Sequence, residues 1–393
     1  MMRSKLPDVG ITIFTEMSQL ALEHQAINLG QGFPDYNPDA LLVQCVNEAM
    51  FAGHNQYAPM TGVQSLREVV AEKIARLQAH EYDPGEEITI TSGATEALAS
   101  SMTALVHPGD EVILIDPSYD LYAPVARLAG GTVVRVAMIP PTAEIPRFVM
   151  DWDALEEAIS PKTRMIVLNF PNNPTGTILG EADLTRLEAI VARHDVLLLS
   201  DEAYEHIVFD GESHRSLASR PALAERSIVV SSFGKTFHAT GWKIGYVCAP
   251  KALSREIRKV HQFLVFSVPT PMQYGLAAYM RKHARLEQLS AFYQQKRDRL
   301  KAGLAGSAFR PLDSQGTFFL LVDTAMLGNS KEKELARRLT TDYGIGAIPV
   351  SAFYDDPDAP HANHQLLRLC FAKQDRTLDR AVEALRAVPG FVG

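Results

Sequence analysis

The sequence predicts an α/β fold in which a large domain with a mostly parallel, seven-stranded sheet adjoins a smaller α+β domain. Seven short apolar segments between residues 88 and 248 are rich in valine and isoleucine. They show little polar alternation, which is typical of strands buried on both faces. Helical patterns such as 95–106 and 183–193 separate most of them. Strands that alternate with helices indicate a parallel sheet covered by helices on both sides.

The expected elements follow one another in two different patterns along the chain. The strands of the first pattern comprise residues 88–91, 112–115, 132–136, 165–168, 196–199, 228–230 and 246–248. The last third mixes strands at 316–322 and 366–371 with helices at 254–266, 274–300, 331–343 and 377–387. We therefore expect an N-terminal segment, 1–40, that joins the small domain, then a large domain, 41–280, and a small C-terminal domain, 281–393.

Length, composition and charge limit the functions that this chain can have. A chain of 393 residues exceeds one ordinary core, and 46% hydrophobic with 21% charged residues is typical of a globular protein. The formal net charge of −8 argues against binding to nucleic acids or to anionic membranes. Three scattered cysteines, no apolar core of a signal peptide and no run of about 18 apolar residues predict a cytoplasmic protein.

Small, polar and aromatic residues directly follow five of the predicted strands. These sets are residues 92–96, 116–119, 169–176, 200–204 and 231–235. Ligands bind beyond the carboxyl ends of the strands in open parallel sheets, so we expect the five sets to form one site. The first set includes Ala94 and Thr95 and joins a glycine to a helix start, where free amides attract an anion such as a phosphate. Taken alone, it could equally be an ordinary turn and cap.

Lys235 and Asp201 have the strongest chemical implications among these residues. A lysine just past a buried strand can have a lowered pKa and attack carbonyls, although most lysines after turns are simply exposed. Ser232 and Lys243 lie close to it in the sequence and suit a phosphate. Asp201 ends an apolar strand and needs a partner for its charge, either a protonated heterocyclic nitrogen or a helix N-terminus. No metal site is expected, because the usual His and Cys spacings do not occur.

Five motifs, in sequence order, resemble those of the class I aminotransferases, which are enzymes of fold type I that use pyridoxal 5′-phosphate (PLP). The motifs are 169–176 (Asn-Phe-Pro-Asn-Asn-Pro-Thr-Gly), 200–204 (Ser-Asp-Glu-Ala-Tyr), 231–235 (Ser-Ser-Phe-Gly-Lys), 241–246 (Gly-Trp-Lys-Ile-Gly-Tyr) and 366–371 (Leu-Leu-Arg-Leu-Cys-Phe). Segments 31–35, 55–62, 231–246 and 258–263 are similar to methionine aminotransferases and to kynurenine and glutamine transaminases. The resemblance covers about residues 30–371 and makes the large domain the PLP-binding one.

The resemblance implies a role for each cofactor-binding residue. Lys235 would hold PLP as a Schiff base and later carry the proton, while Asp201 would pair with the pyridinium nitrogen. The further contacts that it implies are Asn173 and Tyr204 at the ring oxygen, Tyr119 on the ring face, and Ala94, Thr95, Ser232 and Lys243 at the phosphate. Arginine is common in the family where this chain has Lys243, and lysine keeps the charge but loses the fork geometry.

The resemblance also implies the substrate contacts and a homodimer. Arg368 would bind the substrate α-carboxylate with help from Asn173 and the backbone at Gly32. Its apolar neighbours support this interpretation, because a charge in a buried strand needs a reason. Tyr57 would reach the phosphate in the neighbouring subunit.

The predicted substrate has one carboxylate and an uncharged side chain. Residues 262–271 contain no Arg or Lys for a distal carboxylate, and Phe14 and Phe33 would either add aromatic walls or belong to the core. Methionine fits best, with aromatic amino acids or glutamine next, and the amino group would pass to a 2-oxo acid by a ping-pong mechanism. A cysteine-conjugate β-lyase, a kynurenine or glutamine transaminase and, more remotely, a non-catalytic PLP-binding regulator stay open as alternatives.

Overall fold

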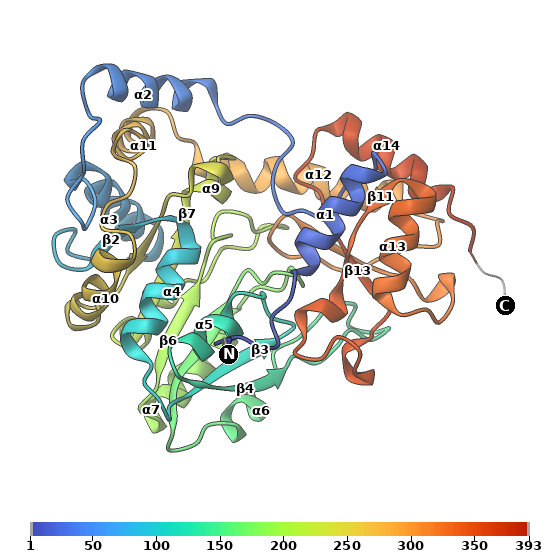
Figure 1. Ribbon diagram of the computed structural model, residues 1–393, viewed down its shortest axis with the longest axis horizontal. Helices are drawn as coiled ribbons and strands as arrows, with labels where there is room; N and C mark the ends of the chain where they lie inside the picture. The colour runs from blue at the N-terminus through green and yellow to red at the C-terminus, as the bar shows by residue number, and fades with distance from the viewer. Residues whose placement is uncertain (1–2, 391–393) are drawn as a thin grey trace.

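A seven-stranded sheet forms the centre of the larger part of the molecule (Figure 1). The structure is a computed structural model, and it describes residues 3–390. The strands are β2 (Ile88–Thr91), β3 (Glu111–Asp116), β4 (Thr132–Ala137), β5 (Thr163–Asn169), β6 (Leu197–Asp201), β7 (Ser227–Ser232) and β8 (Gly245–Cys248). They lie in the order β2-β8-β7-β6-β5-β3-β4, and of these seven β8 alone runs opposite to the other six. The predicted mostly parallel, seven-stranded sheet is confirmed.

Helices cover both faces of this sheet. Because successive residues of a strand point to opposite sides, each central strand contributes apolar side chains to the cores on both faces. On one face, Val112 and Leu114 belong to a core shared with α4 (Gly93–Leu105) and α10 (Lys251–Leu264). On the other face, Ile113 and Ile115 belong to a core shared with α6 (Trp152–Glu157) and α7 (Glu181–Arg193). Burial on both sides explains why the strands lack polar alternation.

One edge of the sheet collects the residues that follow five strands. The strands β2, β3, β5, β6 and β7 all point toward this edge, because β2 and β7 both run opposite to β8 between them. Strand β8 therefore begins at the same edge, with Gly245. Two short helices start there as well, α5 (Tyr122–Leu128) after β3 and α9 (Phe233–Thr236) after β7.

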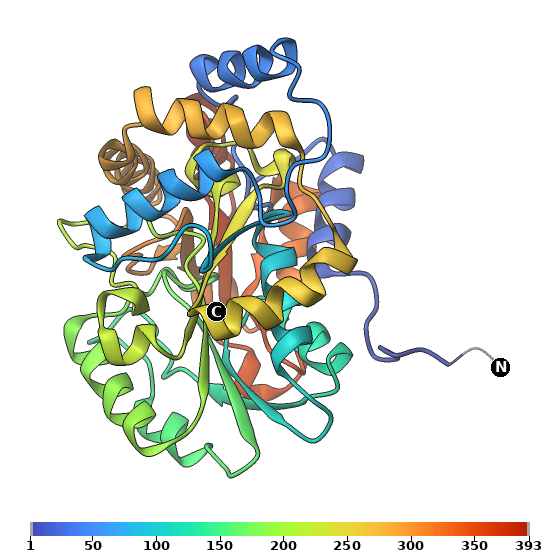
Figure 2. The same ribbon diagram turned by 90° about the vertical axis from the view of Figure 1, so that its left-hand side faces the viewer.

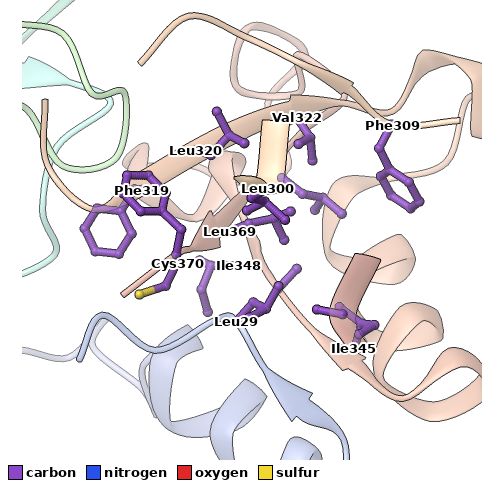
Figure 3. Packing of buried hydrophobic residues seen from close by; sticks show 14 of the residues in the cluster. Leu29, Leu300, Phe309, Phe319, Leu320, Val322, Ile345, Ile348, Leu369 and Cys370 are labelled. Atoms are coloured by element: carbon purple, nitrogen blue, oxygen red, sulfur yellow. The ribbon is translucent and has the colours of Figure 1, made fainter. Parts of the chain in front are cut away.

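The C-terminal part of the chain surrounds a four-stranded antiparallel sheet. Its order is β12 (Ile348–Pro349), β13 (Leu366–Cys370), β10 (Phe319–Asp323) and β9 (Arg310–Pro311), accompanied by α12 (Leu289–Gly303), α13 (Glu332–Tyr343) and α14 (Asp375–Arg386). Phe319, Ile348 and Leu369 pack together in its core (Figure 3). From the N-terminal segment, α1 (Ile13–Glu23) packs against α13, and β1 (Ile27–Asn28) pairs with β11 (Ile345–Gly346). The domain limits at residues 40 and 280 stay a prediction. Residues 1–2, assigned to the N-terminal segment, and residues 391–393, assigned to the C-terminal domain, lie outside the described residues.

The single helix predicted over 274–300 is wrong. The chain forms α11 (Thr270–Lys282) and α12, separated by residues 283–288. No glycine or proline marks this break, so the local pattern carried no stop signal. Helix α11 lies against α2 (Ala40–Phe51) and α3 (Gln64–Gln78), whereas α12 packs against α14 (Figures 1 and 2). No helix within residues 3–390 is long and apolar enough to cross a membrane.

Candidate active site

A cavity of about 570 Å³ lies at the edge of the sheet where the five strand ends meet. Every one of the five predicted sets contributes to its wall, so the structure brings them together. The lining residues from these sets are Gly93, Ala94, Thr95, Tyr119, Asn169, Asn173, Asp201, Ala203, Tyr204, Ser232, Gly234 and Lys235. Lys243 joins them from the segment before β8, and Phe319 and Arg368 come from the C-terminal sheet. The cavity is therefore shared between the two sheets.

Lys235 belongs to α9, just past the end of β7. Its Nζ donates a hydrogen bond to the carbonyl oxygen of Gly32 (2.9 Å) and lies 5.2 Å from the ring centre of Phe318. Burial lowers the pKa of the Lys235 ammonium to about 8. A fraction of the amine is thus neutral at neutral pH, where it can attack a carbonyl or accept a proton.

Asp201 is the last residue of β6 and is buried in the wall of the cavity. The hydroxyl of Tyr122 donates to its Oδ2 (2.8 Å), and the backbone N–H of Ala203 donates to its Oδ1 (3.1 Å). Burial raises the pKa of Asp201, while these two hydrogen bonds partly lower it. Among residues 3–390 no cation bonds this carboxylate directly, so a cationic nitrogen of a ligand would be a favourable partner.

Tyr122 is a site residue that the sequence interpretation missed. It begins α5 three residues after Tyr119, and the two ring centres lie 5.7 Å apart in the wall of the cavity. Spacing by three residues at the start of a helix was the available signal. Asn169 was also not singled out: its Nδ2 donates to the carbonyl oxygen of Asp201 (3.0 Å), and its Oδ1 accepts from the backbone N–H of Asn173 (2.9 Å). The first of these bonds joins the ends of β5 and β6, and the second fixes the segment that follows β5.

The starts of α4 and β8 form a cradle at one end of the cavity. Gly93 (φ 72°) and Lys243 (φ 53°) both have left-handed backbone conformations, and Lys243 Nζ donates to Thr95 Oγ1 (3.2 Å). A Cβ atom on Gly245 would lie 2.9 Å from the backbone nitrogen of Ala94, so only glycine permits this close approach. Free amides at a helix N-terminus, an ammonium and a hydroxyl together favour an anion such as a phosphate.

Arg368, on β13, is buried at 1% exposure. Its Nη1 donates to Oδ1 of Asn173 (2.6 Å), and its Nη2 donates to the carbonyl oxygen of Gly30 (2.7 Å). The guanidinium lies 3.9 Å from the ring centre of Phe319, and burial lowers its pKa to about 10. Its Nε has no partner within residues 3–390. A buried guanidinium that has no anionic partner in the protein favours the binding of a carboxylate from a ligand.

The remaining predicted residues lie at the cavity with one exception. Phe14, Gly32 and Phe33 line it, and the unpredicted lining residues include Thr12 and Asp120. The exception is the Tyr57 side chain, which is 83% exposed and packs edge-on against the ring of Phe266, with ring centres 5.3 Å apart.

Comparisons with known proteins agree along almost the whole chain. Residues 24–385 match the family described as aminotransferase class I and II. A methionine aminotransferase of Escherichia coli is 48% identical over 98% of this chain and 97% of its own length. The crystal structure of E. coli YbdL, described as having a methionine aminotransferase function, gives a TM-score of 0.94 over 99% of this chain and all of that one. A probable N-succinyldiaminopimelate aminotransferase of Mycobacterium tuberculosis is 40% identical over 97% of each chain, and human kynurenine–oxoglutarate transaminase 1 is 33% identical over 97% of each.

Proposed function

The chain belongs to the class I and II aminotransferases, and on that premise we propose that it holds PLP in this cavity and uses methionine as its main amino donor. The family match confirms the resemblance that the motifs indicated. One observation carries the proposal: a lysine of lowered pKa, a buried aspartate and a buried arginine, Lys235, Asp201 and Arg368, surround one cavity.

The residues present fit the chemical parts of PLP. The cradle of Thr95, Lys243 and the amides at the start of α4 suits the phosphate. Asp201, buried without a cation, suits the protonated ring nitrogen. Lys235 suits the aldehyde. When bound, PLP supplies a carbonyl that captures the amino group and a ring that takes up the electrons of the broken bond at the α-carbon.

Lys235 transfers the proton of the substrate, whereas Arg368 binds and orients the substrate carboxylate. A pKa of about 8 lets the amine of Lys235 both accept the α-proton and return it, since a general base works best near the operating pH. Arg368 offers two donors in a fixed plane, so it holds the α-carboxylate in one orientation. That orientation exposes the bond to the α-hydrogen and thereby favours transamination over loss of the carboxylate.

The lining favours an uncharged substrate side chain. The cations that line the cavity, within residues 3–390, are Lys235, Lys243 and Arg368, and each already has a proposed partner. A second substrate carboxylate would find no free cation there and would meet the carboxylate of Asp120. The rings of Phe14 and Phe33 suit a thioether or an aromatic group. Methionine satisfies these conditions, in agreement with the activity given for the E. coli relative.

We also propose that the active form is a homodimer. Tyr57 lies outside the cavity of its own chain and contacts the ring of Phe266, which is 50% exposed, and Phe263, three residues earlier in the sequence, is 85% exposed. Such a patch favours burial against another surface. A second copy that covers it would bring Tyr57 to the partner's phosphate cradle. Light scattering of the purified protein should give twice the chain mass, and Tyr57→Ala should weaken PLP binding without changing that mass.

The absorption spectrum of the purified protein tests the proposal directly. Addition of PLP should give a visible band in the wild type and in Lys259→Ala, an exposed-lysine control, but not in Lys235→Ala. L-methionine added without any 2-oxo acid should bleach this band and release 4-methylthio-2-oxobutanoate. A wild type without the band, or Lys235→Ala with an unchanged band, would contradict the PLP site. A band that methionine leaves unchanged would reject methionine as the donor.

A further inference from the structure

Two buried carboxylates lie next to the cavity without lining it. The segment 202–206 directly follows β6, and Tyr204 from this segment lines the cavity together with Asp201, the last residue of the strand. Glu202 and Glu205 do not line the cavity, and they are only 2% and 8% exposed. Ionised carboxylates at such depth need specific partners, because burial strongly disfavours their charge.

Three side chains from three different elements donate hydrogen bonds to Glu205. Lys73, on α3, donates to its Oε2 (2.6 Å), and the hydroxyl of Tyr246, on β8, donates to its Oε1 (2.7 Å). The hydroxyl of Ser231, on β7, donates to the same Oε1. Burial alone would raise the pKa of Glu205, but Lys73 above all holds it well below its ordinary range, so the group stays ionised.

Three of the four residues in this cluster adjoin parts of the site in the sequence. Glu205 follows Tyr204 and Ser231 precedes Ser232, and both Tyr204 and Ser232 line the cavity. Tyr246 follows Gly245, which lies against Ala94 in the phosphate cradle. A single carboxylate thus connects the segment that carries Tyr204 to the end of β7 and to the start of β8, which forms part of the phosphate cradle. The segment 203–206 is a turn outside the regular sheet, so side-chain anchors set its position more than strand pairing does.

We infer that Glu205, held by Lys73, Ser231 and Tyr246, is a positioning residue that fixes Tyr204 relative to the phosphate cradle and so tunes the bound cofactor. The inference rests on the proposed PLP site and deepens it. Because Glu205 directly follows Tyr204, any shift of Tyr204 would also move Glu205. This movement would lengthen the hydrogen bonds to the buried Glu205 carboxylate, and bonds to a buried charge are among the costliest to lose. The hydroxyl of Tyr204 is thereby kept at one place in the wall.

A double-mutant cycle distinguishes this role from a merely structural one. The readout is the midpoint pH of the visible band of the PLP-loaded protein, together with the PLP dissociation constant. A hydroxyl that donates to a ring oxygen favours its anionic form, so Tyr204→Phe should raise the midpoint. Glu205→Gln should raise it in the same direction by roughly half a unit or more, and weaken PLP binding roughly tenfold. In the Tyr204→Phe background, Glu205→Gln should add no further shift.

Glu332→Gln is the matched control, because Glu332 is also buried, at 1% exposure, and accepts backbone hydrogen bonds from His364 (3.0 Å) and Leu366 (2.8 Å) in the C-terminal part. It should lower the unfolding temperature and leave the midpoint pH unchanged. If Glu205→Gln does not fold, Tyr246→Phe removes one of the same hydrogen bonds and should give a smaller shift of the same sign.

Three results would overturn the inference. They are an unshifted midpoint in Glu205→Gln, a shift of equal size with and without the Tyr204 hydroxyl, and an equal shift in Glu332→Gln. A wild type that forms no PLP band would overturn the proposed function and the inference with it. If the visible band of the wild type is present and titrates with pH, the proposed function stands, and the variants then test the inference alone.

Discussion

Replacing Arg368 by glutamine should remove most of the activity but change the stability of the ligand-free protein only modestly. Burial lowers the pKa of Arg368 from 12.5 to about 10, which corresponds to roughly 3 kcal/mol of unfavourable free energy for the charged form. Glutamine is neutral and relieves this cost. Its amide can still serve one of the two acceptors, Asn173 Oδ1 and the Gly30 carbonyl, and the unserved one costs roughly 1–3 kcal/mol. We therefore expect the free energy of unfolding to change by less than about 2 kcal/mol.

Catalysis should respond quite differently to the same substitution. Loss of a buried, hydrogen-bonded partner for the substrate carboxylate costs roughly 3 kcal/mol or more, so kcat/KM for methionine should fall at least about 100-fold. Urea unfolding without cofactor or substrate gives the first quantity, and steady-state kinetics of the PLP-loaded protein give the second. A monocarboxylate without an amino group, 4-(methylthio)butanoate, should raise the unfolding midpoint of the wild type and not that of Arg368→Gln.

The opposite pattern would refute this reasoning. An arginine that serves the fold should cost roughly 3–5 kcal/mol of stability when its buried contacts are broken. A loss of that size, combined with kcat/KM within about tenfold of the wild type, would show that Arg368 holds the structure rather than the substrate.

Three further predictions follow from the described contacts. Tyr122→Phe removes the hydroxyl that donates to Asp201, so the pKa of Asp201 should rise and PLP binding, measured by titration of the cofactor-free protein, should weaken roughly tenfold; unchanged binding would exclude a role for this bond. Gly245→Ala places a methyl group 2.9 Å from the backbone nitrogen of Ala94, so protection by inorganic phosphate against thermal unfolding should disappear; retained protection would locate the anion site elsewhere. Burial lowers the pKa of His206 to about 4, below its ordinary 6.5, so the stability that its neutral form contributes is complete above pH 6.5 and is lost as the pH falls. Between pH 7.5 and 5, His206→Asn should therefore lose roughly 2 kcal/mol less stability than the wild type, and equal losses would contradict the assignment.

Local patterns in the sequence were sufficient for the sheet and for most of the site. Strands buried on both faces must be apolar throughout, and the residues after parallel strands must share one edge, so the placement of Lys235 and Asp201 at one site followed from chain order alone. The motif resemblance added Arg368, whose isolated charge in an apolar strand was itself a signal. The break between α11 and α12 was missed because no glycine or proline marks it.

Strand periodicity and strand-end composition are local properties of the chain, so the sequence was enough to predict the sheet and most of the residues that line the cavity. The contacts between residues far apart in the sequence depend on the tertiary structure. Arg368 bonds Asn173 and Gly30, which are 195 and 338 positions away, and Lys73 meets Glu205 across 132 positions. Tyr122 faces Asp201 because β3 and β6 end at the same edge of the sheet. Such pairings depend on the order of strands and on the packing of the two sheets, which no local pattern encodes.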